Sequence, residues 1–138
     1  MLTEELREML LQWHEENKHR RIVAAIWAIP EAQRDSETVG LLARALNNDR
    51  RYAEAVEQLE RIREESIGDA CWHFRMGYAR FHQRKYRQAL EYLTRAAQLD
   101  PDDPDAPELI AQAKLMLKND IKFGAPAPEQ TRAQEEML

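Results

Sequence analysis

The side chains best suited to metal binding or catalysis are four histidines and one cysteine: His14, His19, His73, His82 and Cys71. The histidines lack the spacing of metal ligands, since a separation of nine residues does not put His73 and His82 on one face of a helix. Cys71 and His73 are alternate residues, whose side chains diverge on a helix, so they make no nucleophile and base pair. The sequence has no glycine-rich phosphate loop and no nucleophile elbow. We therefore expect a protein that is not an enzyme, with no catalytic residue, no metal and no cofactor.

The composition indicates one globular domain of a cytoplasmic protein. The 138 residues are 43% hydrophobic and 33% charged, which is enough apolar material for a core. A single cysteine excludes an internal disulfide framework and agrees with a reducing compartment. No stretch approaches the roughly 18 apolar residues of a membrane span, and acidic residues interrupt the apolar start of the chain. The net charge of −5 argues against a general nucleic-acid binder, so we expect neither nucleic acid nor a membrane as a partner.

An internal repeat with a period of 34 residues organises the sequence. Equivalent residues 34 apart are Tyr52 and Tyr86, Ala55 and Ala89, and Leu59 and Leu93. They define two abutting units, Ser36–Asp69 and Ala70–Asp103. Each unit has two stretches in which apolar residues recur every three to four positions, the pattern of an amphipathic helix. The sequence therefore predicts an all-α fold.

The polar connections within the two units are so short that the helices on either side must fold back as antiparallel hairpins. Residues 3–35 read as a degenerate copy of the repeat, which is typical of a terminal unit. Residues 104–119 read as a capping helix with Ile110, Ala113 and Leu117 facing inward. We expect these parts to form one repeat domain over residues 1–119. Gly124, Pro126 and Pro128 break helical structure, so residues 120–138 are predicted to be a flexible tail.

The 34-residue helix–turn–helix period resembles the tetratricopeptide repeat family. The second unit carries the family's small residues at Gly77, Ala89 and Ala96, its proline at Pro101, and its large residues at Tyr86 and Leu93. His73 stands where the family usually has tryptophan, with Trp72 one step earlier, and Arg80 replaces a usual aromatic residue. The resemblance implies a right-handed superhelical stack of antiparallel hairpins, an α-solenoid of about seven helices.

The resemblance also implies a binding site, because the family generally holds extended peptides or partner helices on the concave side lined by the first helix of each hairpin. The family register places on that side seven candidate partner-binding residues: Arg44, Asn47, Asn48, Phe74, Arg75, Tyr78 and His82. The arginines could clamp a carboxylate, the asparagines could hold a peptide backbone, and the aromatic rings offer flat apolar area. The alternative interpretation is a solvated helix face with aromatic residues that belong to the core.

The charges of the second unit favour an acidic segment in the partner. Six bases and one acid lie between Ala70 and Leu99, whereas the preceding unit has more acids than bases. Ordinary helix-surface charge is the alternative explanation. Chaperone-binding members of the family hold a C-terminal carboxylate with five residues, which fall here on Arg7, Leu11, Leu41, Cys71 and Arg75. Only Arg7 and Arg75 have suitable chemistry, which argues against that function.

The leading hypothesis is therefore a cytoplasmic adaptor, a non-enzymatic module that binds a peptide or a helix in the concave groove of a tetratricopeptide-like solenoid. A second hypothesis is an assembly protein that pairs as a homodimer through its exposed repeat ends or its tail. A third is a toxin-neutralising inhibitor of the immunity type, suggested by a likeness of WHEEN and LLARALNN to helical modules of some bacterial proteins.

Overall fold

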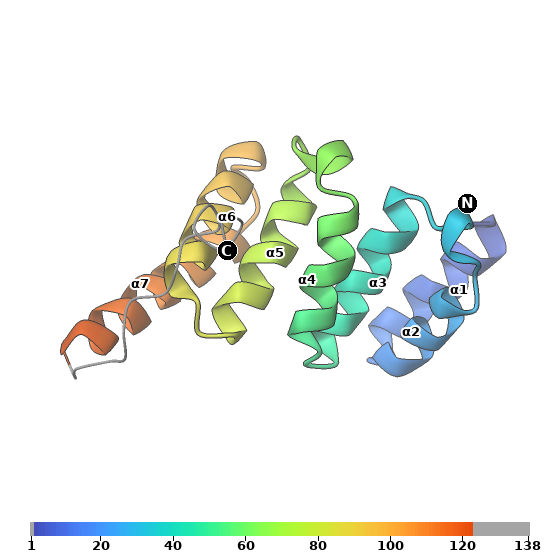
Figure 1. Cartoon of the computed structure of the whole chain (residues 1–138), viewed down its shortest axis with the longest axis horizontal. Helices are drawn as coiled ribbons and strands as arrows, with labels where there is room; N and C mark the ends of the chain where they lie inside the picture. The colour runs from blue at the N-terminus through green and yellow to red at the C-terminus, as the bar shows by residue number, and fades with distance from the viewer. Residues whose placement is uncertain (1, 123–138) are drawn as a thin grey trace. The chain divides into compact units, whose positions relative to one another are not determined.

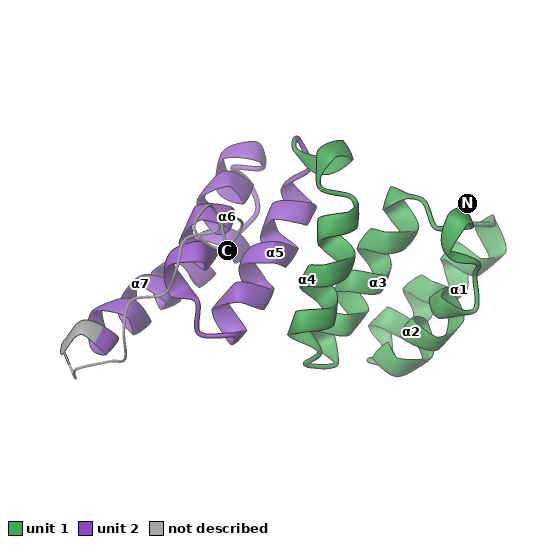
Figure 2. Ribbon diagram, in the orientation of Figure 1, with its two compact units in different colours: residues 1–67 green, residues 68–138 purple. Residues whose placement is uncertain are grey.

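The computed structural model describes residues 2–122, and in that range the chain forms seven α-helices, two short 3-10 helices and no strand (Figure 1). The all-α fold of helical hairpins expected from the sequence is confirmed. The chain divides into two compact units, residues 1–67 and residues 68–138 (Figure 2). Over the described residues, none of the helices has the length and apolar character that crossing a bilayer requires.

Unit 1 consists of two helical hairpins with a short 3-10 helix after each. Its elements are α1 (Glu4–Glu15), α2 (His19–Trp27), η1 (Glu31–Gln33), α3 (Ser36–Asn48), α4 (Tyr52–Arg61) and η2 (Glu64–Ser66). Each helix packs on the next one in the chain. The apolar faces of these helices meet in a core whose largest buried side chains are Leu10, Ile22, Ile26, Leu42, Leu46 and Leu59. The degenerate first hairpin therefore keeps its apolar stripe on the inside.

Unit 2 consists of one hairpin and a longer final helix. Its elements are α5 (Ala70–His82), α6 (Tyr86–Leu99) and α7 (Asp105–Lys122), and α6 packs against both of the others. Trp72 is buried with its ring edge-on to Tyr92, the centroids being 5.9 Å apart. The tryptophan that stands one residue early, beside the half-buried His73, thus still fills the core of this unit.

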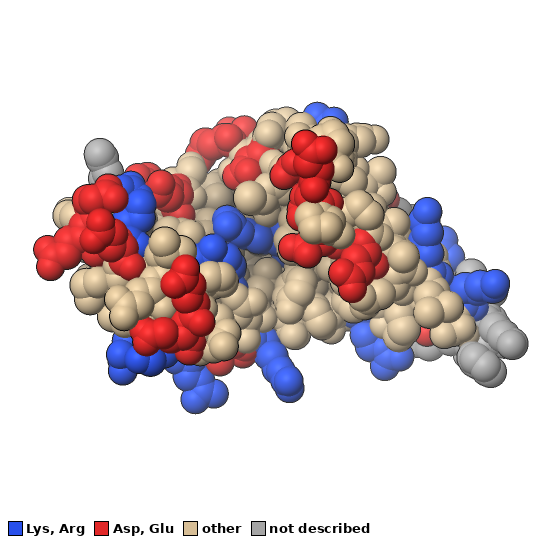
Figure 3. Space-filling view, turned by 180° about the vertical axis from the view of Figure 1, so that it is seen from behind, with Lys and Arg blue, Asp and Glu red and all other residues tan. Residues whose placement is uncertain are grey.

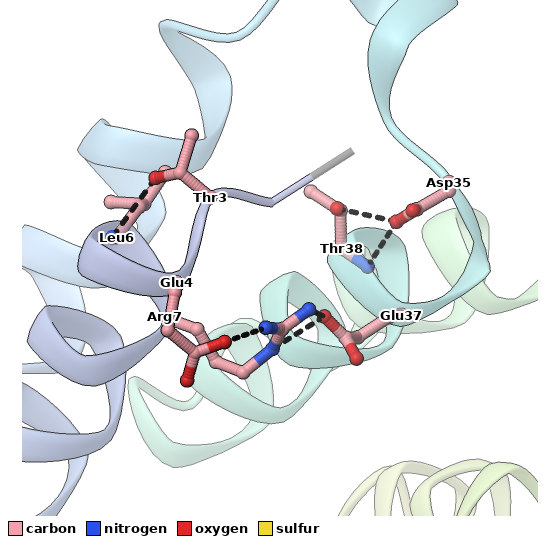
Figure 4. Close-up of polar contacts among 7 residues, drawn as sticks. All are labelled: Thr3, Glu4, Leu6, Arg7, Asp35, Glu37 and Thr38. Atoms are coloured by element: carbon pink, nitrogen blue, oxygen red, sulfur yellow. Dashed lines mark hydrogen bonds and ion pairs between the residues drawn. The ribbon is translucent and has the colours of Figure 1, made fainter.

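The two kinds of helix begin in different ways. The first helices of the three hairpins start at a side-chain cap: Thr3, Asp35 and Asp69 accept hydrogen bonds from the backbone N–H groups of Leu6, Thr38 and Cys71. Figure 4 shows the first two of these caps. The second helices start after a residue of positive φ, namely Asn17, Arg50 and Arg84. A left-handed residue reverses the chain within one or two positions, which is why the short polar connections suffice.

Gly77 explains how closely the two helices of unit 2 approach. A Cβ atom at this position would lie 2.6 Å from Cγ of Leu93 and 3.3 Å from the carbonyl oxygen of Ala89. Only glycine therefore allows α5 and α6 to cross at this distance. Gly77 is one of the small residues of the family pattern, and the close approach of the two helices explains the need for it.

The final helix is longer than the capping helix expected over residues 104–119. Ala113 is buried, and Ile110 and Leu117 are half-buried, so the side expected to face inward does so in part. The helix continues to Lys122. Most of the predicted flexible tail, residues 123–138, lies outside the described residues.

Candidate partner-binding surface

A row of aromatic rings follows one side of α5 in unit 2. Phe74, Tyr78 and His82 are four residues apart, so their side chains stand above one another on the helix. The ring centroids of Phe74 and Tyr78 are 6.2 Å apart, and those of Tyr78 and His82 are 4.4 Å apart. Phe74 and Tyr78 are half-buried and His82 is exposed. These three predicted site residues therefore form a continuous aromatic strip that solvent reaches along its length.

Arg75 lies on the same helix beside this strip. Burial lowers the pKa of its guanidinium, and the nearby Cys71 and Asp69 act in the opposite direction. Removal of a cation from water costs free energy, which an anionic neighbour offsets. A carboxylate brought to this guanidinium would act in the same direction as Asp69.

Phe81 differs from the residues of the aromatic strip, because in the last turn of α5 its ring packs against the start of α6. Its ring is 5.5 Å from that of Tyr86, the buried first residue of α6, and 5.2 Å from that of His82. Phe81 is itself half-buried. It therefore joins the end of α5 to the start of α6, in accord with the core interpretation of the aromatic residues.

The final helix adds apolar surface to unit 2 that the sequence analysis did not assign to the site. Leu115 is 58% exposed, and Leu109 and Met116 are half-buried. α7 contacts α5 as well as α6. The 34-residue period could have identified these positions, because Leu109, Leu115 and Met116 follow Arg75, Phe81 and His82 by 34 residues.

The three predicted site residues of unit 1 lie on α3 in different environments. Arg44 is half-buried and Asn48 is exposed, whereas Asn47 is only 4% exposed. Because the Asn47 side chain is buried, we expect a ligand on α3 to contact Arg44 and Asn48 before it contacts Asn47. The two sets of predicted residues belong to different units, with Arg44, Asn47 and Asn48 in unit 1 and the aromatic strip with Arg75 in unit 2.

Arg7 is a further charged residue on a first helix, and other side chains already hold it. Its guanidinium donates from Nε and Nη2 to Oε1 of Glu37 on α3, over 3.1 and 2.8 Å, and from Nη1 to Oε2 of Glu4, over 2.7 Å (Figure 4). The hydrogen bond and charge of Glu37 raise the pKa of Arg7. Because two carboxylates already bind its guanidinium, Arg7 is poorly placed to bind a third. This strengthens the argument against a site that holds the C-terminal carboxylate of a chaperone.

The described residues do not bring the candidate metal ligands together. His14 and His19 approach to 6.0 Å between ring centroids in unit 1. Among residues 2–122, no three histidine, cysteine, aspartate or glutamate side chains are placed to share a metal ion. Cys71 is an exposed free thiol.

Comparison with known proteins identifies the repeat. The family model of the tetratricopeptide repeat matches residues 70–103, which cover α5 and α6. Among solved structures, the NMR structure of the first tetratricopeptide repeat domain of the human RPAP3 protein is similar, with a TM-score of 0.75 and 17% sequence identity. That alignment covers 86% of this chain and 94% of the other. A search of the curated proteins finds no match.

The matched residues are the second unit of the 34-residue period, with the boundaries that the sequence predicted. The structural likeness shows that the fold is that of a tetratricopeptide repeat domain. The expected resemblance to the tetratricopeptide repeat family and the expected helical solenoid fold are thus confirmed.

Proposed function

We propose that this tetratricopeptide repeat protein is a non-enzymatic interaction module that holds a peptide or a partner helix against the first helices of its hairpins. The observation that carries this proposal is the aromatic strip of Phe74, Tyr78 and His82 with Arg75 beside it. The matched repeat contains all four residues. The family generally uses this side of its repeats for binding, and the proposal extends that use to this chain.

The chemistry of α5 favours a partner with apolar and acidic side chains. Aromatic rings bury much area at a low cost in conformational entropy, and tyrosine and arginine are common where interfaces are strongest. The partly desolvated Arg75 favours a carboxylate, to which a guanidinium donates two parallel hydrogen bonds. We infer that the segment bound here has an acidic residue next to an apolar one.

Unit 1 would offer a ligand polar groups of its own through Arg44 and Asn48 on α3. The exposed Asn48 can donate to a carbonyl and accept from an N–H of a peptide backbone. Arg44 adds a second cation for an acidic ligand. We place the protein in the cytoplasm on the strength of its composition.

The test is capture of partners by the purified full-length chain, with the bound proteins identified by mass spectrometry. The aromatic strip and Arg75 together are called the α5 surface. Tyr78→Ala and Arg75→Glu are expected to lose the partners that the wild type retains, because each removes one side chain of this surface. Arg95→Glu is the matched control, since it reverses an exposed arginine on the second helix of the same hairpin. Circular dichroism would verify that each variant is folded. Undiminished capture by both α5 variants would remove this surface as the binding site.

A second candidate function is self-association, which the exposed apolar residues of the terminal helices favour. Leu115 on α7 is 58% exposed and Leu11 on α1 is 53% exposed. Apolar side chains that lie open in a monomer are covered when two copies pair. Light scattering after size exclusion would distinguish the two: a dimer lost on Leu115→Glu supports assembly, and a monomer at all concentrations opposes it. The toxin-neutralising function stays a prediction from the sequence.

A further inference from the structure

Unit 1 contains a cleft whose lining residues all lie between Glu31 and Glu65, before α5 begins. Its volume is about 400 Å³, and it is enclosed by η1, the start of α3, the end of α4 and η2. The residues that give the cleft its chemistry are Glu31, Asp35, Ser36, Gln58, Arg61 and Glu65. None of the predicted partner-binding residues lines it, so the cleft calls for a separate explanation.

Gln58 is the least expected feature of the cleft wall. The residue is only 9% exposed, and its Oε1 atom is buried without a hydrogen-bond partner. A buried acceptor that lacks a donor costs free energy, and native structures keep few such groups without a reason. Because the side chain lines the cleft and its terminal amide torsion is soft, a donor bound in the cleft can meet this acceptor. The unmet requirement is therefore for a hydrogen-bond donor.

The carboxylates of the cleft also favour a ligand that donates hydrogen bonds. Oε2 of Glu65 accepts the hydroxyl hydrogen of Ser36 over 2.5 Å, which fixes the carboxylate at the cleft and leaves its Oε1 able to accept from a ligand. Asp35 is used differently, because its Oδ1 accepts from the backbone N–H and the hydroxyl of Thr38 at 3.0 and 2.6 Å. Glu65 is thus the carboxylate best placed to receive a cation.

The two arginines of the cleft have other partners. Arg34 donates to the carbonyl oxygens of Ile29 and Trp27, at 2.9 and 3.2 Å, where α2 ends. Arg61 forms an ion pair with Glu31. Both cations thus have partners of their own, and the Glu65 carboxylate and the Gln58 acceptor remain on the wall for a ligand. The Arg61–Glu31 pair also shows that the rim of this cleft accommodates a guanidinium.

The apolar part of the wall suits an aliphatic stem. Val39 of α3 and Ile62 at the end of α4 line the cleft and are themselves buried. The methylene groups of an arginine side chain cover apolar surface of this kind while the charged end reaches polar groups. Acidic side chains also gather in patches on the face of the molecule that Figure 3 shows. The exposed acids of α4 and η2 would attract a cation towards unit 1.

We propose that this cleft binds the side chain of an arginine presented by a peptide, with the guanidinium donating to Gln58 and Glu65 and the stem against Val39 and Ile62. Arginine fits better than lysine because its planar group has five N–H donors in a fixed fork, which can serve an amide oxygen and a carboxylate together. This site is independent of the proposed α5 surface, and either can fail without the other.

The test is a titration of the full-length protein with the blocked tripeptide Gly-Arg-Gly, followed by NMR. A single side chain is expected to bind with a Kd on the order of millimolar, with shifts confined to the backbone signals of the cleft. The matched peptides are Gly-Lys-Gly, expected to bind more weakly, and Gly-citrulline-Gly, which has the shape of arginine without its charge and is not expected to bind. Equal binding of the citrulline peptide, or no saturable binding of the arginine peptide, would overturn the proposal.

Variants of the protein locate the site. Glu65→Gln and Gln58→Leu are each expected to weaken binding of the arginine peptide by roughly tenfold, because the first removes the negative charge and the second removes the buried acceptor. Glu57→Gln is the control, since Glu57 is an exposed acid of α4 that does not line the cleft, and it should change the affinity little. An equal loss in Glu57→Gln would assign the binding to general electrostatics instead. If ethylguanidinium binds at least as tightly as the arginine peptide, the proposal that a peptide supplies the guanidinium is wrong.

Discussion

Arg7 on α1 donates two hydrogen bonds to a single oxygen of Glu37 on α3, although the two residues are 30 positions apart in the chain. Both helices are the first helices of their hairpins, so this ion pair lies on the side of unit 1 that the family register assigns to ligands. The pair joins two repeats and also neutralises a cation there. The surface that would receive an acidic partner therefore depends more on α5 than on α1.

The Arg7–Glu37 pair is expected to contribute only modestly to stability. Both side chains are well exposed to solvent, where water and salt screen the attraction. A double-mutant cycle with Arg7→Ala and Glu37→Ala, measured by urea unfolding, should give a small favourable coupling that falls as sodium chloride is raised. A coupling that resists high salt would contradict this view of the pair as a screened surface interaction.

Gly77→Ala is expected to destabilise the protein by about 1 to 3 kcal/mol, the usual cost of overpacking a core. The added Cβ atom would meet the side chain of Leu93 at 2.6 Å and force α5 and α6 apart. Gly68→Ala is the matched control, because no atom lies within 4 Å of its Cβ position. This second change should be neutral or stabilise by up to about 1 kcal/mol, since alanine restricts the unfolded chain. Chemical unfolding of both variants measures the difference, and equal effects would refute the close-approach explanation.

Arg84→Gly is expected to raise the free energy of unfolding by about 0.5 kcal/mol. Arg84 has a φ of 65°, a conformation that costs an L-residue roughly 1 to 2 kcal/mol and glycine very little. The greater freedom of glycine in the unfolded chain offsets part of that gain. Arg95→Gly removes the same side chain from the interior of α6, where it should cost about 1 kcal/mol. Thermal unfolding should thus move in opposite directions for the two variants.

Asp35 is expected to make stability depend on pH at the acidic end. Hydrogen bonds from the Thr38 hydroxyl and backbone lower the pKa of Asp35 from its usual 3.8. A folded-state pKa below the unfolded one stabilises the fold above the unfolded pKa, and this contribution is lost as pH falls through the folded pKa.

Variants at Asp35 separate its charge from its capping role. Asp35→Asn keeps an N-cap acceptor but does not titrate, so its difference in unfolding free energy from the wild type should shrink between pH 7 and pH 3. Asp35→Ala loses the cap and should cost about 1 kcal/mol at pH 7. A difference between the wild type and Asp35→Asn that stays constant over this range would show that the Asp35 charge does not stabilise the folded state.

Much of the helical architecture could be derived from the sequence because its causes are local. The spacing of apolar residues along a helix sets which of its faces is buried, and a short polar connection between two such stretches makes a hairpin. Tyr52, Ala55 and Leu59 recur after 34 residues, and this repetition shows which positions of the two repeats are equivalent. The same register placed Gly77 where two helices cross, and it predicted which side chains of α5 stand in one row.

The geometry of the candidate site was predictable only to the extent that its residues lie on a single helix. Phe74, Tyr78 and His82 share a face of α5 whatever surrounds them, because four residues are about one helical turn. Whether a face is open or covered is decided by neighbouring helices, so neither the burial of Asn47 nor the packing of Phe81 on Tyr86 follows from helical period.

Contacts between distant segments are what the tertiary structure alone decided. Arg7 could have paired with several acids, and only the packing of unit 1 put Glu37 within reach. The cleft lined by Gln58 and Glu65 has the same origin, since it lies where the two helices of the second hairpin and the two 3-10 helices converge. The sequence by itself determined the helices, their order and the inner face of each. The packed chain determined which charges meet and which buried acceptor is left without a donor, because those depend on distances that local spacing does not set.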